Sequence, residues 1–198
     1  STGYKVANGA VSITPDGTPR QTVMQAAKAA GKRIGLVTTA TVYDATPAAF
    51  GINAKSRRDS QQLVDLLLAL EPDVLMGGGA DYFLPACAPG GKRKDGKDIV
   101  AVFRAKGYGI VGNTAELNAA RGTKLLGLFA DEDMDFELDR DPVKEPTTAE
   151  MARAALDALS RHNPNGFVLL VENENVDTAA HANDAASLMR ALWAFDDA

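Results

Sequence analysis

The sequence predicts an α/β fold, a three-layer sandwich in which helices cover both faces of a mostly parallel central sheet. Apolar, strand-like segments alternate with segments of helical periodicity along the chain, and this alternation is typical of βαβ units. The expected strands are apolar throughout, as strands buried on both faces are. With 198 residues, 45% of them hydrophobic, the chain is long enough to form a single domain with its own core.

The first half of the chain contains five segments that predict regular structure. Thr18-Pro19-Arg20-Gln21 matches a capping sequence with proline at the first helical position, so a helix is expected from there to about Ala30. Residues 33–40 are apolar and β-branched and predict a buried strand. Residues 46–52 predict a short helical turn, residues 59–70 a helix that ends before Pro72, and residues 73–79 a strand that runs into a glycine turn.

The second half continues the alternation. Helices are expected at residues 99–106, at residues 114–120, from a Thr147–Glu150 capping box to about Ser160, and in the last segment to Phe195. Strands are expected within residues 107–113, 124–130 and 166–172. Irregular structure is expected at residues 85–98 and 131–146. The order of these elements supports the mostly parallel sheet.

Charge and composition exclude several classes of protein. The net charge of −5 argues against a general nucleic-acid binder. No run of about 18 apolar residues occurs, so no membrane span is expected. Cys87 is the only cysteine, which excludes an internal disulfide and a cysteine metal cluster.

Oxygen-bearing side chains follow two of the expected strands. Glu172 ends the strand within residues 166–172, and Asp44 and Thr46 come after the strand of residues 33–40. Ligands of open α/β sheets bind beyond the carboxyl ends of the strands. These three side chains are therefore expected on one edge of the sheet if the two strands are near neighbours. Carboxylate and hydroxyl oxygens together suit magnesium.

Asp177 and His181 stand four residues apart, which places both on one face of a helical turn, within about 6 Å of each other. An aspartate and a histidine on one face suit zinc. The alternative from spacing alone is a solvated loop after Glu172, with Asp177 as a helix N-cap. His162, the only other histidine, is expected at a helix C-terminus, where the helix dipole favours it, rather than as a ligand.

Four long motifs in this order resemble the alkaline phosphatase family: KRIGLVTTATVYDATPAAFG, DVLMGGGADYFLP, KLLGLFADEDMDFELDRDP and GFVLLVENENVDTAAHANDAA. The resemblance extends over essentially the whole chain, including the opening STGYKVANGA. It implies hydrolysis of phosphate monoesters, with Zn²⁺ and Mg²⁺ as cofactors and a phosphate monoester or inorganic phosphate as the bound partner. It also implies a homodimer in a secreted or periplasmic location.

The resemblance implies metal-binding roles for five residues. Thr46 matches a direct magnesium ligand of the family, Asp44 matches the aspartate that contacts this ion through water, and Glu172 matches its third protein ligand. Asp177 and His181 match two ligands of the first zinc ion. The family spacing between the glutamate, the aspartate and the histidine is kept.

The family's phosphate-clamping arginine matches Arg57, and a shift of one residue in the match would give Arg58 instead. An arginine suits this role because its planar guanidinium group can bind two phosphate oxygens at once.

Some features depart from the family pattern. Asn173 and Glu174 stand where the family usually has small residues, and the extra carboxylate could crowd the site or recruit another cation.

The D-S-A motif of the family's serine nucleophile does not occur in the 198 residues. The resemblance places that serine before Ser1, and the remaining zinc ligands outside Ser1–Ala198. Residues 1–198 are therefore expected to form a partial alkaline phosphatase-like domain, incomplete at both ends and inactive by itself.

Three functions are open at this point. The first is the phosphomonoesterase of which this chain would be a part. The second is a non-catalytic relic domain that binds a divalent cation or phosphate. The third is a phosphodiesterase or sulfatase relative, which the DATPAA motif and the Glu172, Asp177 and His181 spacing disfavour. A partial sheet also predicts open strand edges and exposed apolar surface, and hence low stability or association.

Three other segments carry alternative interpretations. Gly77-Gly78-Gly79 could cradle a phosphate, but a tight exit from a strand is the favoured interpretation. Residues 90–97, GGKRKDGK, could bind an anion, but a solvated loop is favoured. Residues 131–139 resemble a calcium-binding loop only loosely, because the glycine expected at the sixth position is missing.

Overall fold

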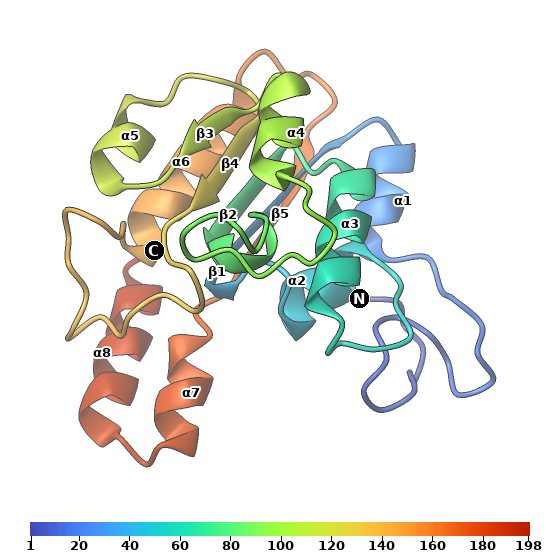
Figure 1. The fold of residues 1–198 in the computed structure, drawn as a ribbon, viewed down its shortest axis with the longest axis horizontal. Coiled ribbons are helices and arrows are strands. Elements are labelled where there is room, and N and C mark those ends of the chain that lie inside the picture. The colour runs from blue at the N-terminus through green and yellow to red at the C-terminus, as the bar shows by residue number, and fades with distance from the viewer.

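The central sheet has five strands that all run parallel, in a computed structural model that describes residues 1–198. The strands are β1 (Arg33–Thr41), β2 (Val74–Gly78), β3 (Gly109–Val111), β4 (Leu125–Leu128) and β5 (Phe167–Val171). Their order in the sheet is β3-β4-β2-β1-β5 (Figure 1). The predicted α/β class and the parallel sheet are confirmed.

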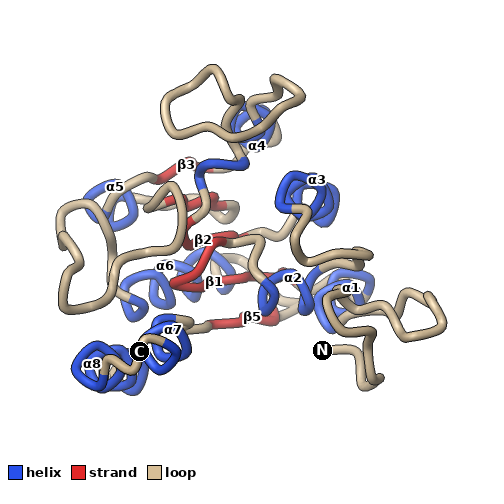
Figure 2. Tube along the Cα trace, turned by 60° about the horizontal axis from the view of Figure 1, so that its bottom comes forward, coloured by secondary structure: helices blue, strands red, loops and turns tan.

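Helices cover both faces of this sheet. The helices of the chain are α1 (Val23–Ala29), α2 (Ala45–Gly51), α3 (Ser60–Leu70), α4 (Ile99–Ala105), α5 (Thr114–Ala119), α6 (Thr148–Ser160), α7 (Asn175–His181) and α8 (Ala185–Asp196), with a short 3-10 helix η1 (Ala80–Tyr82). α1 to α4 pack on one face around a core that includes Leu36 and Phe103. α5 and α6 pack on the other face around Met76 and Met151. Figure 2 shows the two helical layers on either side of the strands.

None of the helices is long and apolar enough to cross a membrane.

β1 is the strand that positions the candidate site. It pairs with β2 on one side and with β5 on the other, so that Gly35 lies beside both Val74 and Leu169. Because the strands are parallel, their carboxyl ends meet at one edge, where open α/β sheets bind ligands. β1 leads into α2 at this edge, and β5 leads toward α7. The condition that the two strands be near neighbours is therefore met.

The start of α1 differs from the prediction. The helix begins at Val23, where Thr22 and Gln25 form a capping box. The Thr22 side chain accepts a hydrogen bond from the Gln25 backbone N–H at 3.2 Å, and the Gln25 side chain accepts one from the Thr22 N–H at 3.0 Å. The predicted start at Thr18 is wrong, because Pro19 instead forms an antiparallel bridge with Ile13.

The last predicted helix is divided into α7 and α8, which pack side by side as a hairpin at the lower left of Figure 1. Between them Asn183 has a positive φ of 55°. The Asp184 side chain then caps α8 by accepting hydrogen bonds from the backbone N–H groups of Ala186 and Ser187. The capping box of Thr147 and Glu150 at the start of α6 is confirmed.

The glycine triplet makes a tight exit from β2, as the favoured interpretation predicted. Gly79 has φ of 92°, a left-handed conformation that side chains with a Cβ rarely adopt. A Cβ on Gly78 would collide with the carbonyl oxygen of Glu132. The triplet therefore allows the segment of residues 131–133 to cross the end of β2 in close contact.

β5 forms an open edge of the sheet. All five of its residues are only partly buried, and it pairs with β1 alone. Leu192, Trp193 and Phe195 of α8 are also exposed, at 50%, 53% and 41%. The expected open edge and apolar surface are confirmed, whereas low stability or association stays a prediction.

Candidate active site

A polar cleft lies at the carboxyl ends of β1 and β2. It has a volume of about 350 Å³ and is lined by Ala40, Thr41, Tyr43, Asp44, Arg57, Asp81, Tyr82, Lys92, Glu132, Asp133 and Glu174. A second, wholly polar cleft of about 850 Å³ is lined by Asn8, Gly9, Asp44, Lys55, Ser56, Arg57 and Arg58. Asp44 and Arg57 line both clefts, so these two residues stand where the clefts adjoin.

Asp44 and Arg57 form an ion pair, with Arg57 Nη2 at 3.0 Å from Asp44 Oδ1. Asp44 occupies the N-cap position of α2, but its side chain makes no capping hydrogen bond. Its carboxylate is therefore available to groups in the cleft. Arg57 is half-exposed, whereas its backbone N–H donates to the Gly9 carbonyl at 2.8 Å. Arg58 lines only the outer cleft, so the geometry favours Arg57 over Arg58 as the arginine next to Asp44.

Glu172 follows β5 directly and is tied to β1. Its backbone N–H donates to the Val37 carbonyl at 2.9 Å. Thr38 Oγ1 donates to its carboxylate oxygen Oε2 at 2.8 Å. Thr46 lies in the first turn of α2, the helix that follows β1. The structure thus brings the elements that carry Asp44, Thr46 and Glu172 to one edge, although Thr46 and Glu172 do not line the cleft itself.

Asp177 and His181 lie on one face of α7, as their spacing predicts. His181 Nε2 is 3.5 Å from Asp177 Oδ2, and both side chains are exposed, at 83% and 73%. The N-cap of α7 is Glu174, so the alternative interpretation of Asp177 as an N-cap is wrong. His162 follows the end of α6, with a left-handed φ of 50°, and lines neither cleft.

Sequence reasoning missed a chain of polar groups on the wall of the cleft. The Tyr43 hydroxyl donates to Asp81 Oδ1 at 2.6 Å, and Lys92 Nζ lies 3.1 Å from Asp81 Oδ2. Lys92 also pairs with Glu132, and these two partners raise the pKa of its ammonium group, with Glu132 as the larger cause. Burial, followed by the Asp81 hydrogen bond, raises the pKa of the Tyr43 hydroxyl. The only signal in the sequence was that Asp81 stands two residues after the glycine turn.

The favoured interpretation of residues 90–97 as a solvated loop is wrong for Arg93. Its side chain is fully buried and pairs with Asp65 at 2.8 Å and with Asp95 at 2.8 Å. It also donates to the Tyr82 carbonyl at 3.3 Å. Because Lys92 and Arg93 are both engaged with carboxylates, this segment is not a free anion-binding patch either.

Residues 131–139 contribute two carboxylates to the cleft, those of Glu132 and Asp133. Asp133 Oδ1 accepts a hydrogen bond from the Thr41 backbone N–H at 2.7 Å. Burial is the main cause that raises the pKa of this carboxyl group. The segment therefore faces the end of β1 rather than forming a separate loop around a cation.

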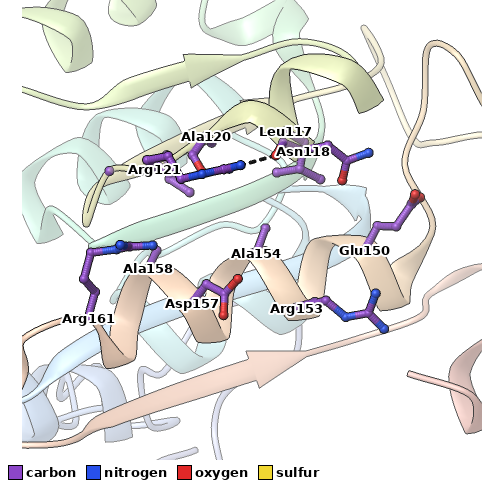
Figure 3. A pocket seen from close by; sticks show the side chains of 12 residues that line it. Leu117, Asn118, Ala120, Arg121, Glu150, Arg153, Ala154, Asp157, Ala158 and Arg161 are labelled. Carbon is purple, nitrogen blue, oxygen red and sulfur yellow. Dashed lines mark hydrogen bonds between the residues drawn. The ribbon is translucent and has the colours of Figure 1, made fainter.

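A different groove lies between α5 and α6 (Figure 3). Its volume is about 390 Å³, and its charged lining residues are Arg121, Glu150, Arg153, Asp157 and Arg161. It shares no residue with the two clefts at the strand ends. None of the residues predicted from the sequence to be functional lines it.

The side chains at the sheet edge suit divalent cations by their chemistry. Asp44, Thr46 and Glu172 offer the hard oxygen atoms that magnesium prefers, and Asp177 with His181 offers an oxygen and a nitrogen atom for zinc. No three His, Cys, Asp or Glu side chains converge on one point. Glu174 Oε2, in a residue that lines the cleft, is buried and has no hydrogen-bond partner in the protein.

Comparison with known proteins places this geometry in a family. The family profile described as alkaline phosphatase matches residues 1–198. The chain belongs to the alkaline phosphatase family. The fold agrees, since the structure of Thermus thermophilus alkaline phosphatase matches with a TM-score of 0.92 and 43% identity over 100% of this chain and 41% of that one.

Two further relatives show how much of a family member this chain covers. The repressible alkaline phosphatase of Saccharomyces cerevisiae is 39% identical over 96% of this chain and 38% of its own length. A mutant of the TAB5 alkaline phosphatase, solved with magnesium bound in its M3 site, matches with a TM-score of 0.81 and 26% identity, over 100% of this chain and 54% of that one. The chain thus spans about 40% of the length of the yeast and Thermus relatives.

Proposed function

We propose that these residues form the phosphate clamp and part of the metal centre of an enzyme that hydrolyses phosphate monoesters. The observation that carries this proposal is the position of Arg57. Its guanidinium group stands 3.0 Å from Asp44, at the junction of the two clefts and at the carboxyl end of β1. Family substrates are phosphate monoesters, and a guanidinium group there can bind two phosphate oxygens.

Each side chain has a role in this proposal. Arg57 orients the phosphoryl group and neutralises charge that develops on its oxygens. Asp44 holds the Arg57 guanidinium in place through their ion pair. Thr38 fixes the Glu172 carboxylate by its 2.8 Å hydrogen bond, so that the carboxylate is oriented before any ligand arrives.

Two cations complete the proposed site. Thr46, Glu172 and, through water, Asp44 would hold Mg²⁺, and Asp177 with His181 would supply two ligands of a Zn²⁺ ion. When bound, these cations supply Lewis acidity and positive charge at the phosphoryl group. A secreted or periplasmic homodimer, as implied by the family resemblance, is part of the same proposal.

A second candidate function is non-catalytic binding of a divalent cation or phosphate. Both candidates need the metal and phosphate residues, but only the first requires turnover by the natural polypeptide that contains them.

Replacement of Glu172 by glutamine is expected to remove most of the stabilisation that Mg²⁺ gives the natural polypeptide. At a Mg²⁺ concentration of 100 times Kd, binding adds about 2.7 kcal/mol to the free energy of unfolding. Glutamine keeps the shape of Glu172 but lacks its negative charge, so the melting temperature should hardly respond to Mg²⁺. Thermal melts with and without Mg²⁺ measure this difference.

The matched control is Asp157→Asn, which removes a negative charge from the groove between α5 and α6. This variant should gain as much stability from Mg²⁺ as the unmodified protein does. An equal gain in the Glu172→Gln variant would remove Glu172 from the metal centre.

A further inference from the structure

Glu174 is held in one orientation at the start of α7. It is the N-cap residue of this helix, and Thr178 Oγ1 donates to its Oε1 at 2.6 Å. The backbone N–H groups of Asp177 and Thr178 both donate to its carbonyl oxygen, which fixes the main chain as well. The side chain and the main chain of Glu174 are therefore both constrained.

The other carboxylate oxygen, Oε2, is buried without a partner. Glu174 lines the cleft at the strand ends together with Asp44 and Asp133. A buried carboxylate oxygen that no donor satisfies costs free energy, and the cost is larger when the group is ionised. Further negative charges on the same cleft increase this cost. A positive group beside Oε2 would offset this cost.

The chain does not supply that positive group. The cations that line the cleft are Arg57 and Lys92. Arg57 pairs with Asp44, and Lys92 pairs with Asp81 and Glu132. Neither forms an ion pair with Glu174. A bound cation would satisfy Oε2, and a carboxylate oxygen is a ligand that Mg²⁺ prefers.

We propose that Glu174 Oε2 is an additional oxygen ligand of the divalent cation at the Asp44 and Glu172 edge. The inference rests on the proposed function for the presence of that cation. The inference goes beyond the proposed function, because the family pattern has a small residue at the position of Glu174. Glu174 adds one negative charge to the site, and the site therefore binds Mg²⁺ more tightly than one with a small residue here would.

The test is calorimetric titration of Mg²⁺ into the chelator-treated natural polypeptide. Glu174→Gln keeps the shape and the acceptor for Thr178 but removes the charge. Its Kd for Mg²⁺ should rise about tenfold, the change that corresponds to about 1.4 kcal/mol. Asp157→Asn is the control with an equal loss of charge. Its Kd for Mg²⁺ should stay within about twofold of that of the unmodified protein, because an exposed charge on another groove is screened.

A second readout separates ligation from a structural role. Without Mg²⁺, Glu174→Gln should melt at the same or a higher temperature, because charge repulsion with Asp44 and Asp133 is relieved. A structural role would instead lower the melting temperature. As a second variant, Thr178→Val releases the carboxylate and should weaken Mg²⁺ binding about threefold, less than Glu174→Gln does.

The outcomes distinguish this inference from the proposed function. Unchanged Mg²⁺ affinity in Glu174→Gln, with lost affinity in Glu172→Gln, overturns the role of Glu174 and leaves the metal centre intact. Unchanged affinity in both variants overturns the metal centre itself. Loss in both, with no loss in Asp157→Asn, supports both proposals.

Discussion

Replacement of Arg57 by alanine is expected to weaken the binding of inorganic phosphate about a hundredfold in the presence of Mg²⁺. The guanidinium group can donate two charge-assisted hydrogen bonds to phosphate. Because half of the Arg57 side chain is exposed, we expect a total just below the low end of their usual range, about 2.8 kcal/mol. Calorimetric titration of phosphate into the natural polypeptide measures the change.

Arg58 offers a matched control, because it is the adjacent arginine and lines only the outer cleft. Arg58→Ala should change phosphate affinity by no more than about threefold, as expected for a screened, exposed charge. Arg57→Lys should recover only part of the lost affinity, because an ammonium group cannot bind two oxygens in the planar geometry of a guanidinium. A larger loss in Arg58→Ala than in Arg57→Ala would assign the clamp to Arg58.

The largest effect on stability is expected from Arg93→Ala. Arg93 is fully buried and joins Asp65 of α3 to Asp95 of its own loop. Removal of one partner from a buried ion pair leaves uncompensated charge. Because Asp65 and Asp95 are partly exposed, the free energy of unfolding should fall by about 3 kcal/mol, the low end of the usual range. Chemical denaturation measures this loss.

Lys97→Ala is the control for this variant, since Lys97 also pairs with Asp95, at 3.3 Å, but is 62% exposed. This variant should lower the free energy of unfolding by less than about 0.5 kcal/mol.

The Arg93 guanidinium also holds the pKa of Asp95 well below its usual range. This stabilisation is fully present above the unfolded pKa of about 3.9 and is lost as the pH falls through the lower, folded value. Equal acid sensitivity in Arg93→Ala and the unmodified protein would contradict this coupling.

The sequence predicts most elements of the fold because their signals are local. β1, β2 and β5 are apolar runs bounded by turn residues, which is how strands covered on both faces differ from amphipathic ones. The start of α1 was not predictable in this way, since Thr18 and Thr22 both offer capping sequences. Contacts from distant segments decide between them, because Thr22 Oγ1 donates to the Gly51 carbonyl at 3.3 Å.

The candidate site, too, is predicted by local motifs in part and depends on contacts between distant segments for the rest. Motif resemblance predicts Asp44, Arg57 and Glu172 as site residues, and the pairing of β1 with β5 brings together the strand ends that precede Asp44 and Glu172. The positions of Lys92 and Arg93 could not be read from the loop sequence. Their carboxylate partners lie up to 40 residues away in the chain, and only folding brings them together. A segment rich in glycine and lysine therefore looked solvated although it anchors a wall of the cleft.

Hydrolysis of a chromogenic phosphate monoester by the natural polypeptide that contains these 198 residues tests the account most directly. The assay is made at alkaline pH with Zn²⁺ and Mg²⁺, beside the Arg57→Ala variant. We expect turnover that requires the divalent cations, with a kcat/KM that falls about a hundredfold in the variant, the change that corresponds to a loss of about 2.8 kcal/mol in phosphoryl-group binding. No turnover with both cations present, or turnover that Arg57→Ala leaves unchanged, would contradict the assignment of this cleft to phosphomonoester hydrolysis.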